Sequence, residues 1–297
     1  MRVLLIGLGD IARKAYLPVL SMRADLDIHL ATRDEVVLDD VGRAFRIAHR
    51  HASAVRALSA TSFDAAFVHA ATPAHGEIVR LLIERGVPTF VDKPLADTLG
   101  EVEALVAMAT ERATPLFIGF NRRFAPDYVA LRGIDANLIV MEKHRHRQPD
   151  VARRVVFDDF IHVVDTLLFL APGPVRRRNI ETHVVDGMLH TVTLTLAGDG
   201  FTAIGTMHRD SGLDEERLDV IGGGARYSVL NLADRIEARG TQHLFRRADW
   251  TSVGRQRGFE AMCDSFLLAA RERRPVDAAG ILTTHEMCEA IVRHTET

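Results

Sequence analysis

The chain has 297 residues, of which 47% are apolar and 26% charged, and its formal net charge is −3. Such a length favours about two domains with sizeable cores. Because acids and bases are nearly balanced, the charge excludes the strongly basic nucleic-acid-binding proteins and provides no attraction to an anionic bilayer. The two cysteines, Cys263 and Cys288, form no C-x-x-C pair, so we expect neither a disulfide framework nor a metal site.

The start of the chain, MRVLLIGLGD, is apolar over too few residues for a signal segment, and no apolar run approaches the length of a membrane span. We therefore expect a cytoplasmic protein that acts on a small-molecule substrate, with no nucleic-acid or membrane partner.

Short apolar runs alternate with helical patterns in the first domain, which we place at residues 1–121. Apolar spacing predicts helices at 11–22, 74–85 and 98–110, the first of them bent by Pro18. Strands alternating with helices indicate a doubly wound α/β fold with a parallel sheet. We predict its strands near residues 3–6, 28–31, 65–69, 89–91 and 116–119.

The second domain, residues 122–297, has a different pattern. A predicted helix at 156–170 is followed by long runs of alternating apolar and polar residues, separated by Gly and Asp turn signals. Two further helical patterns, 259–271 and 281–294, end the chain. Alternation of this kind predicts an α+β domain with an open, mainly antiparallel sheet that has one exposed face.

A G-x-G-x-x-A turn joins the first predicted strand to the first predicted helix. Gly7 permits the tight turn, Gly9 lets the backbone approach a pyrophosphate, and Ala12 allows close packing of the helix on the strand. A purely structural glycine turn is the alternative. We favour a dinucleotide site formed by Gly7, Leu8, Gly9, Asp10, Ile11 and Ala12.

The residues after the second strand indicate which dinucleotide is bound. An acid there pairs with the ribose hydroxyls of NAD, whereas an arginine suits the 2′-phosphate of NADP. Thr32 and Arg33 favour NADP(H), and the adjacent Asp34 keeps NAD(H) as the alternative.

Lysine is rare in this chain: of the 37 basic residues only Lys14, Lys93 and Lys143 are lysines. A partly desolvated ammonium can have its pKa lowered toward neutrality, whereas a guanidinium stays protonated. Lys93, directly before a proline in FVDKPLAD, is therefore a candidate acid or base. The alternative is a solvated loop lysine.

The segment FDDFIHVVDTLLFL places Asp158, His162 and Asp165 on or near one face of an apolar helix. Because buried acids need partners, one interpretation is a mutually satisfied Asp–His pair in an interface. The functional interpretation makes His162 a general acid or base, with a carboxylate that fixes its tautomer.

Four segments together resemble the glucose-fructose oxidoreductase, inositol dehydrogenase and rhizopine-catabolism (Gfo/Idh/MocA) family. GLGDIA, the DKP variant of the family's E-K-P motif, GFNRRF and DDFIHVVD occur in the family's order over essentially the whole chain. Within the family the chain is most similar to the MviM-like branch, as KAYLPVL, VDKPLA and QRGF indicate.

The resemblance implies a Rossmann domain, a second domain with an open antiparallel sheet, and NAD(P)-dependent oxidation or reduction of sugars and polyols. It makes Lys93, Asp158 and His162 the catalytic residues, with Asp165 helping to orient them. It also implies a homo-oligomer, a dimer or tetramer formed through the second sheet. Its further cofactor-binding positions are Ala71, Thr72, His75, Asp92 and Asn121. Asp92 and Ala71 depart from the family's usual glutamate and proline.

Basic residues gather where the second domain begins, in GFNRRF and MEKHRHRQPDVARR. If several face the cleft, the substrate carries a carboxylate or phosphate. The alternative is a solvated basic edge that protects a strand from aggregation. The candidate substrate-binding residues are Arg122, Arg123, Lys143, Arg145 and Asp165.

Three other functions fit the same motifs. Reduction of a C=N bond or a biosynthetic ketone would use the same cofactor and proton donor. A cofactor-binding regulator or sensor would keep the glycine turn without turnover, although the presence of Lys93, Asp158 and His162 argues against it. NAD-dependent glycoside cleavage without net redox change is the third.

Overall fold

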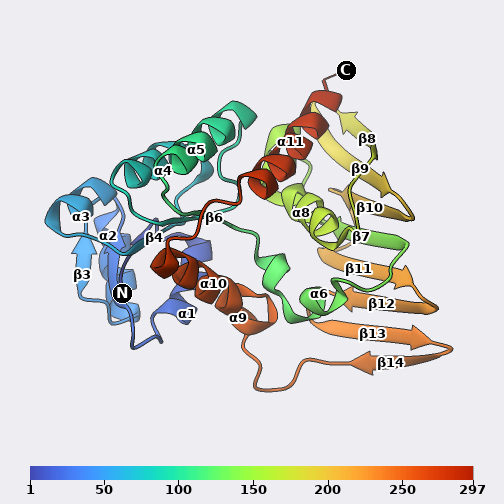
Figure 1. Ribbon diagram of the computed structural model, residues 1–297, viewed down its shortest axis with the longest axis horizontal. Coiled ribbons are helices and arrows are strands. Elements are labelled where there is room, and N and C mark those ends of the chain that lie inside the picture. The colour runs from blue at the N-terminus through green and yellow to red at the C-terminus, as the bar shows by residue number, and fades with distance from the viewer. Residues whose placement is uncertain (297) are drawn as a thin grey trace. The chain divides into compact units, whose positions relative to one another are not determined.

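The structure, a computed structural model, describes residues 1–296 (Figure 1). It divides into two compact units: residues 1–119 with 259–283, and residues 120–258 with those from Thr284 onward. We predicted domains at 1–121 and 122–297. The units differ from that division because the segment 259–283 groups with the first unit.

The first unit contains a six-stranded parallel sheet in the order β3-β2-β1-β4-β5-β6, which confirms the predicted doubly wound fold. The sequence did not predict β3, because its three residues, HRH, carry no apolar pattern. The strands are β1 Arg2–Ile6, β2 Asp27–Ala31, β3 His49–His51, β4 Ala65–Val68, β5 Thr89–Asp92 and β6 Leu116–Gly119.

Helices cover both faces of this sheet, with α4 and α5 on one face and α1 and α10 on the other (Figure 1). The sequence did not predict α2 or α3. The helices assigned to this unit are η1 Ala12–Tyr16, α1 Leu17–Leu20, α2 Glu35–Ala44, α3 Ala54–Ala60, η2 Thr72–Ala74, α4 His75–Glu84, α5 Leu99–Glu111 and α10 Phe259–Glu272.

The helix after the glycine turn is distorted, as we expected from the presence of Pro18. Residues Ala12–Tyr16 form a π-helical turn, η1, in which the Leu17 N–H donates to the Ala12 carbonyl five residues earlier. Proline has no N–H to donate and its ring crowds the carbonyl four residues back. The wider π turn accommodates Pro18 and directs Tyr16 into the core.

The second unit contains an eight-stranded sheet in the order β14-β13-β12-β11-β7-β10-β9-β8. All neighbours are antiparallel except β7 and β10, so the predicted open, mainly antiparallel sheet is confirmed. The strands are β7 Leu138–His144, β8 Arg177–Val185, β9 Met188–Gly198, β10 Phe201–His208, β11 Glu215–Gly222, β12 Ala225–Leu230, β13 Asp234–Arg239 and β14 Thr241–Phe245.

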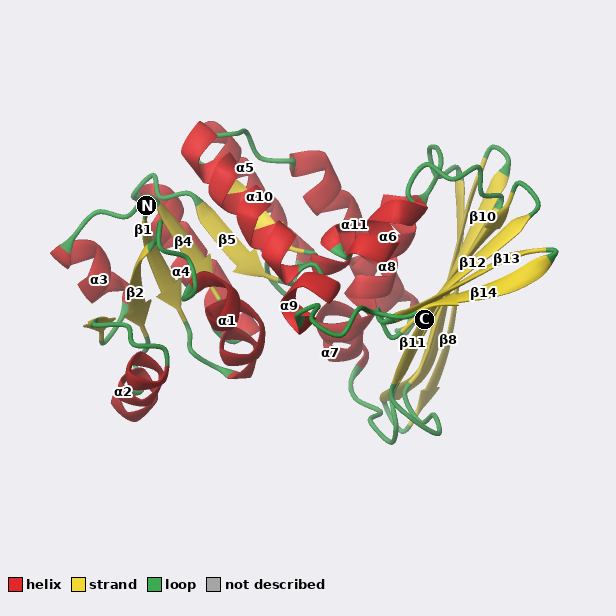
Figure 2. Ribbon diagram, turned by 90° about the horizontal axis from the view of Figure 1, so that it is seen from below, coloured by secondary structure: helices red, strands yellow, loops and turns green. Residues whose placement is uncertain are grey.

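The helices of the second unit lie on one face of this sheet (Figure 2). A side chain at Gly205 of β10 would collide with Val163 and Leu167 of α8, so the glycine allows the helix to pack closely on the central strands. The helices are η3 Asn121–Phe124, α6 Pro126–Leu131, α7 Ala152–Val155, η4 Val156–Phe160, α8 Ile161–Leu170, α9 Val253–Gln256 and α11 Ala278–His294, the last beginning in the first unit.

Within residues 1–296 no helix is both long enough and apolar enough to cross a bilayer.

Candidate active site

The glycine turn after β1 has the geometry that a dinucleotide requires. Gly7 has a φ of +86°, and a Cβ there would lie 2.5 Å from the backbone nitrogen of Ala70. A Cβ at Gly9 would meet nothing within 4 Å, so this position opens onto free space. Leu8 and Ala12 are buried, which fixes the turn on the sheet. The residues therefore fit a bound pyrophosphate, with Gly9 providing the close approach.

Two charged residues at the corner after β2, Arg33 and Asp34, could select the cofactor, and they differ in their contacts. Asp34 caps α2: its side chain accepts a hydrogen bond of 3.0 Å from the Val37 N–H. Arg33 is exposed, and Thr32 is half-buried. Since Asp34 has a structural partner, Arg33 is the better placed of the two charged residues to meet a ligand.

His75 links the loops that follow β4 and β5. It is buried, and its ring nitrogens lie 2.8 Å from the carbonyl oxygens of Ala70 and Pro94. Lys93 precedes Pro94 through a cis peptide bond and is half-buried. The imidazole thus holds the Lys93 loop beside the β4 loop, which continues through Ala71 and Thr72.

Asp92, at the end of β5, has a partner that the sequence did not reveal. The Tyr16 hydroxyl donates a 2.6 Å hydrogen bond to Asp92 Oδ1, and its ring stacks on His69 with centroids 3.9 Å apart. Burial raises the pKa of Asp92, against the opposing effect of Lys93 and Tyr16. Burial also lowers the pKa of His69 to about 3, which keeps its imidazole neutral. A tyrosine in an apolar helix needs a partner for its hydroxyl, and that was the available signal.

In the second unit, Arg122 is committed to a buried ion pair. Its guanidinium donates two hydrogen bonds to Glu216, of 2.8 Å and 2.5 Å, and Tyr128 donates a third, of 2.9 Å, to the same carboxylate. Both charged side chains are under 10% exposed. Burial alone would raise the pKa of Glu216, but Arg122 outweighs it and lowers that pKa to about 2. This bidentate pair is a fixed part of the unit.

Arg123 and Asp165 form a second ion pair, with hydrogen bonds of 2.7 to 3.1 Å. Asp165 is 1% exposed, and burial raises its pKa although Arg123 opposes the change. Asn121 is also buried: its amide donates to the Arg257 carbonyl at 2.8 Å. Asn121, predicted at the cofactor, thus holds the Arg257 backbone in the second unit.

Lys143 and Arg145 converge with Arg209 on one carboxylate, that of Asp159. Arg145 donates to it at 2.8 and 2.9 Å, Arg209 donates at 2.7 Å, and the Lys143 ammonium contacts Oδ1 directly. Burial lowers the pKa of Lys143 to about 7, although Asp159 opposes the change. The pKa of Asp159 lies well below its usual range because Lys143 and Arg145 outweigh its burial.

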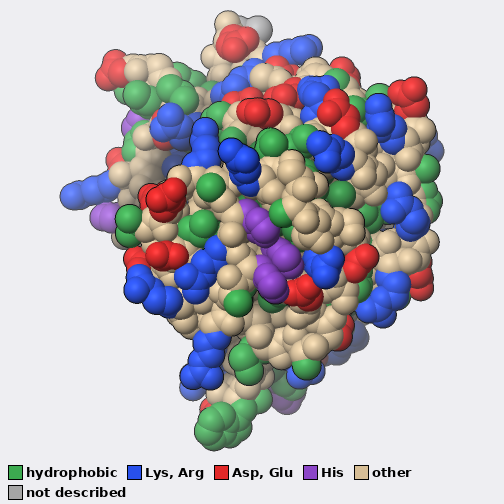
Figure 3. Space-filling model, turned by 90° about the vertical axis from the view of Figure 1, so that its left-hand side faces the viewer, with side chains coloured by type: hydrophobic (Ala, Val, Ile, Leu, Met, Phe, Trp, Pro, Cys, Tyr) green, Lys and Arg blue, Asp and Glu red, His purple; other side chains and the backbone are tan. Residues whose placement is uncertain are grey.

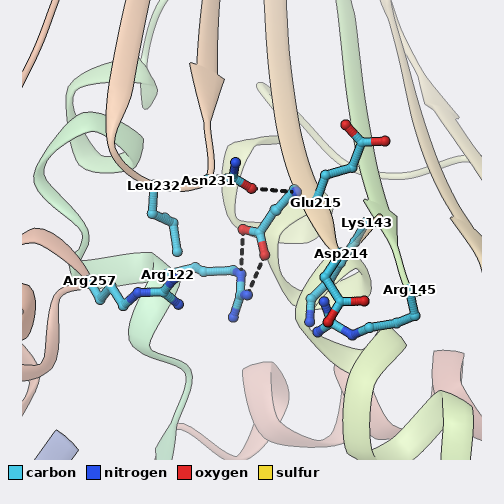
Figure 4. A pocket seen from close by; sticks show the side chains of 9 residues that line it. Arg122, Lys143, Arg145, Asp214, Glu215, Asn231, Leu232 and Arg257 are labelled. Carbon is cyan, nitrogen blue, oxygen red and sulfur yellow. Dashed lines mark hydrogen bonds and ion pairs between the residues drawn. The ribbon is translucent and has the colours of Figure 1, made fainter. Parts of the chain in front are cut away.

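Some of these charged side chains, namely Arg122, Glu216, Lys143 and Arg145, line a cavity of about 160 Å³ in the second unit (Figure 4). Glu216 faces Arg122, which donates two hydrogen bonds to its carboxylate. Asn231 and Leu232, in the wall, both have left-handed backbone angles, φ 51° and 57°, which are strained for a leucine. The lining residues are Arg122, Lys143, Arg145, Asp214, Glu215, Glu216, Asn231, Leu232 and Arg257.

Four cationic side chains line this cavity, and three of them, Arg122, Lys143 and Arg145, form ion pairs with carboxylates. Within residues 1–296 the fourth, Arg257, has no such ion pair. Its backbone is fixed by Asn121, and by Gly258, where φ is +81° and a Cβ would lie 2.5 Å from the Ala125 nitrogen. The neighbouring Gln256 donates to the Leu232 carbonyl at 2.7 Å. Arg257 is exposed, so a bound anion could reach it.

Asp158 and His162 lie on a helix with a π-helical turn. The predicted helix at 156–170 exists, but its first five residues, Val156–Phe160, form η4, which continues as α8. Asp158 is exposed and His162 half-buried, and the Thr166 hydroxyl donates to the His162 carbonyl at 2.7 Å. Single π turns often occur at functional sites because they reorient side chains.

The structure groups the predicted residues in two sets. Gly7, Arg33 and His75 follow strands, and Asp92 ends one, at the carboxyl edge of the first sheet, where open α/β folds bind ligands. The candidate substrate residues and the pair Asp158 and His162 belong to the second unit, and Lys93 to the first.

Sequence reasoning missed several residues of the second unit, and one of them, Glu216, carried a signal. Glu216 shares its strand face with Leu218 and Val220, just as the predicted residue Lys143 shares its face with Ile139 and Met141. A charge within a period-two apolar stripe indicates a buried charge with a partner. Lys143 and Glu216 are direct register partners across β7 and β11. The other missed residues are Tyr128, Asp159, Arg209 and Arg257.

Comparison with known proteins agrees with both units. A family model described as an oxidoreductase family with an NAD-binding Rossmann fold (GFO_IDH_MocA) matches residues 1–120, and one described as YceM-like, C-terminal domain matches residues 126–239.

Three similar proteins illustrate the match. The chain is 34% identical to the Salmonella typhimurium protein YceM over 290 residues, 94% of this chain and 92% of YceM. It is 35% identical over 216 residues to the myo-inositol dehydrogenase Hyg17 of Streptomyces leeuwenhoekii, covering 67% of this chain and 63% of Hyg17. The crystal structure of a dehydrogenase (MviM) from Clostridium difficile superposes with a TM-score of 0.92, at 29% identity, over 99% of both chains.

Proposed function

The chain belongs to the Gfo/Idh/MocA family of NAD-binding oxidoreductases, and from this premise we propose that it is a dehydrogenase that prefers NADP(H). Its proposed substrate resembles a sugar or polyol and carries an anionic group. The observation that carries the proposal is the glycine turn, where Gly7 excludes any side chain and Gly9 faces open space. A structural turn would need only the first of these properties.

The preference for NADP(H) rests on the corner after β2. Asp34 is engaged as the cap of α2, and Arg33 is exposed beside it. A guanidinium pairs well with a phosphate, whereas ribose hydroxyls need an available carboxylate.

The proton transfer is assigned to Lys93 with Asp158 and His162. A bound nicotinamide supplies or accepts the hydride at the reacting carbon. In the direction of reduction, the Lys93 ammonium donates a proton to the carbonyl oxygen as it becomes an alcohol oxygen; in oxidation, the amine accepts that proton. From the family resemblance we assign His162 and Asp158, on one helix of the second unit, a general acid–base role in the same reaction.

The anionic group of the substrate is inferred from the cavity of the second unit. Most of its buried charges are paired with one another, as Arg122 is with Glu216 and Lys143 with Asp159. Arg257 adds a guanidinium beyond these pairs. A carboxylate or phosphate would neutralise it through a charge-assisted hydrogen bond. The similarity to the myo-inositol dehydrogenase Hyg17 supports a polyhydroxylated carbon frame.

A substrate screen tests this function. Purified protein with NADP+ or NADPH is assayed by nicotinamide absorbance against inositols, neutral sugars, and the matched sugar acids and sugar phosphates. We expect the highest kcat/KM with an anionic member of a pair. Turnover of neutral members alone would refute the anionic group, and cofactor binding without turnover of any member would argue against a dehydrogenase of polyols.

We also infer a dimer through the face of the second sheet that lies opposite α8. Gly205 faces α8, so its neighbour Ile204 points away, in a row with Val140 and Thr195 of the adjacent strands. These three side chains are only half-buried in the single chain, and their apolar surface favours pairing. Light scattering should give twice the chain mass, and Ile204→Arg should give a monomer. A monomeric wild-type protein would refute the inference.

A further inference from the structure

Three histidines and an aspartate gather where β2 and β3 lie side by side in the first unit. Asp27 and His29 point to the same side of β2, because side chains alternate along a strand. His49 is the register partner of His29 across the parallel pair, and His51 follows it at the same spacing. Figure 3 shows adjoining histidine side chains on the surface of this part of the molecule. Nothing in the dehydrogenase chemistry uses them.

The spacing of the nitrogen and oxygen atoms suits one metal ion. His29 Nε2 lies 3.5 Å from Asp27 Oδ2, and His49 Nε2 lies 3.6 Å from Asp27 Oδ1. The ligand atoms of these three residues all lie within 4.8 Å of one another. Around a tetrahedral zinc ion with bonds of about 2.1 Å, ligand atoms are about 3.4 Å apart. Only small side-chain movements are therefore required.

His29 is the unusual member of the group. It is 6% exposed, and its Nε2 makes no hydrogen bond with any residue of 1–296. Its other nitrogen, Nδ1, lies 2.9 Å from His51 Nε2. When Nδ1–H donates to His51, the lone pair of Nε2 is directed toward Asp27 and His49. A ligating histidine is commonly oriented in this way by a partner of its second nitrogen.

The carboxylate of Asp27 has a further partner outside the histidines. Arg2 also contacts the cluster: it donates to Asp27 Oδ2 at 3.0 Å and to the Thr61 hydroxyl at 2.8 Å. Asp27 Oδ1 remains on the side of His49.

We propose that Asp27, His29 and His49 bind one Zn²⁺ ion, that His51 positions His29, and that the ion fastens the short edge strand β3 to β2. Two imidazoles and one carboxylate suit Zn²⁺ and disfavour Mg²⁺, which prefers oxygen ligands. Since His49 is exposed, water can take the fourth position. From the sequence we expected no metal site because the two cysteines lack the spacing of metal ligands. That expectation did not take these histidines into account.

Calorimetric titration of untagged, chelator-treated full-length protein with Zn²⁺ tests the proposal, with Mg²⁺ as the comparison ion. We expect one Zn²⁺ per chain at micromolar affinity or tighter, and no response to Mg²⁺. Loss of a residue that orients a metal ligand costs up to roughly 100-fold in affinity. His49→Ala removes a ligand itself and should therefore weaken Zn²⁺ binding by more than that. His243→Ala, which removes an exposed histidine of β14, is the matched control and should bind like the wild type.

The role of His51 has its own test. His51→Ala should weaken Zn²⁺ binding about 10-fold, and His51→Gln should restore most of the affinity, because its amide oxygen can accept from His29 Nδ1–H. Co²⁺ should give a tetrahedral visible spectrum that Asp27→Asn and His49→Ala both lose. Absence of Zn²⁺ binding, or equal affinity in wild type, Asp27→Asn and His49→Ala, would overturn the proposal even if one variant folds poorly.

Discussion

The two units hold their functional groups in different ways. In the first, the proposed phosphate-binding surface is backbone from six consecutive residues, Gly7 to Ala12, positioned by one glycine with a left-handed φ. In the second, the Arg122–Glu216 pair joins residues 94 positions apart in the sequence. Backbone recognition requires few buried charges. Side-chain recognition in the second unit requires many, and each must be paired. Variants should therefore affect chemistry in the first unit, and both stability and binding in the second.

Lys93→Ala should give the largest effect and separate chemistry from stability. Loss of a positioned proton donor costs about 10² to 10⁴-fold in rate. We expect kcat to fall by that factor, while NADPH affinity stays within a few-fold and the unfolding midpoint is nearly unchanged. The control is Lys14→Ala, because Lys14 forms an exposed i,i+4 pair with Asp10 at 2.8 Å. Wild-type turnover by Lys93→Ala would remove this lysine from the mechanism.

Glu216→Ala, in contrast to Lys93→Ala, should mainly lower the stability of the protein. It leaves the buried Arg122 guanidinium without its carboxylate and Tyr128 without its acceptor. Removing one partner of a buried pair typically costs about 3 to 5 kcal/mol. Urea denaturation should show that loss in the free energy of unfolding, whereas Asp40→Ala, at an exposed pair with Arg43, should cost under about 1 kcal/mol. Equal costs would contradict the contrast between the units.

Arg257→Ala should affect binding of one class of substrate. We expect KM for the anionic substrate to rise about tenfold, equivalent to about 1.4 kcal/mol. The KM of a matched neutral substrate should hardly change, and kcat should change less than KM. Arg255→Ala, two residues earlier on the exposed side of α9, serves as the control. Equal KM changes for anionic and neutral substrates would show that Arg257 does not contact the anion.

Lys143→Met should change the pH dependence of stability. The pKa of Lys143 falls from 10.5 to about 7 on folding, because of burial. Between these values the unfolded chain binds a proton that the folded chain has released, so the wild-type free energy of unfolding should rise with pH, by roughly 1 kcal/mol per unit. The variant lacks this contribution. Parallel wild-type and variant stability curves between pH 7 and 9 would contradict the lowered pKa.

The sequence predicted the parts of the fold that have local signals. In the first domain, strands alternating with helices predicted five of the six parallel strands, and in the second, alternating apolar and polar residues predicted the open sheet. Pro18 predicted the distortion of the first helix. The missing strand, β3, is His-Arg-His at a sheet edge, where packing against His29 replaces the usual apolar pattern. Its omission also hid the histidine cluster.

The candidate site divides in the same way. The glycine turn could be identified because its residues are consecutive and each has a steric reason. Asp159 could not be separated from its neighbour Asp158, since only the helix and sheet together show that Lys143, Arg145 and Arg209 converge on it. Tyr16 was also missed, because its contact with Asp92 joins residues 76 positions apart.

The most direct test of the proposed dehydrogenase is a calorimetric titration of cofactor-free protein with NADPH and NADH in parallel, for the wild type and for Arg33→Ala. The geometry of the turn and the corner predicts NADPH binding at least about tenfold tighter than NADH, and loss of that preference in Arg33→Ala. Tighter binding of NADH would contradict the role of Arg33, and binding of neither dinucleotide would contradict the assignment of the glycine turn itself.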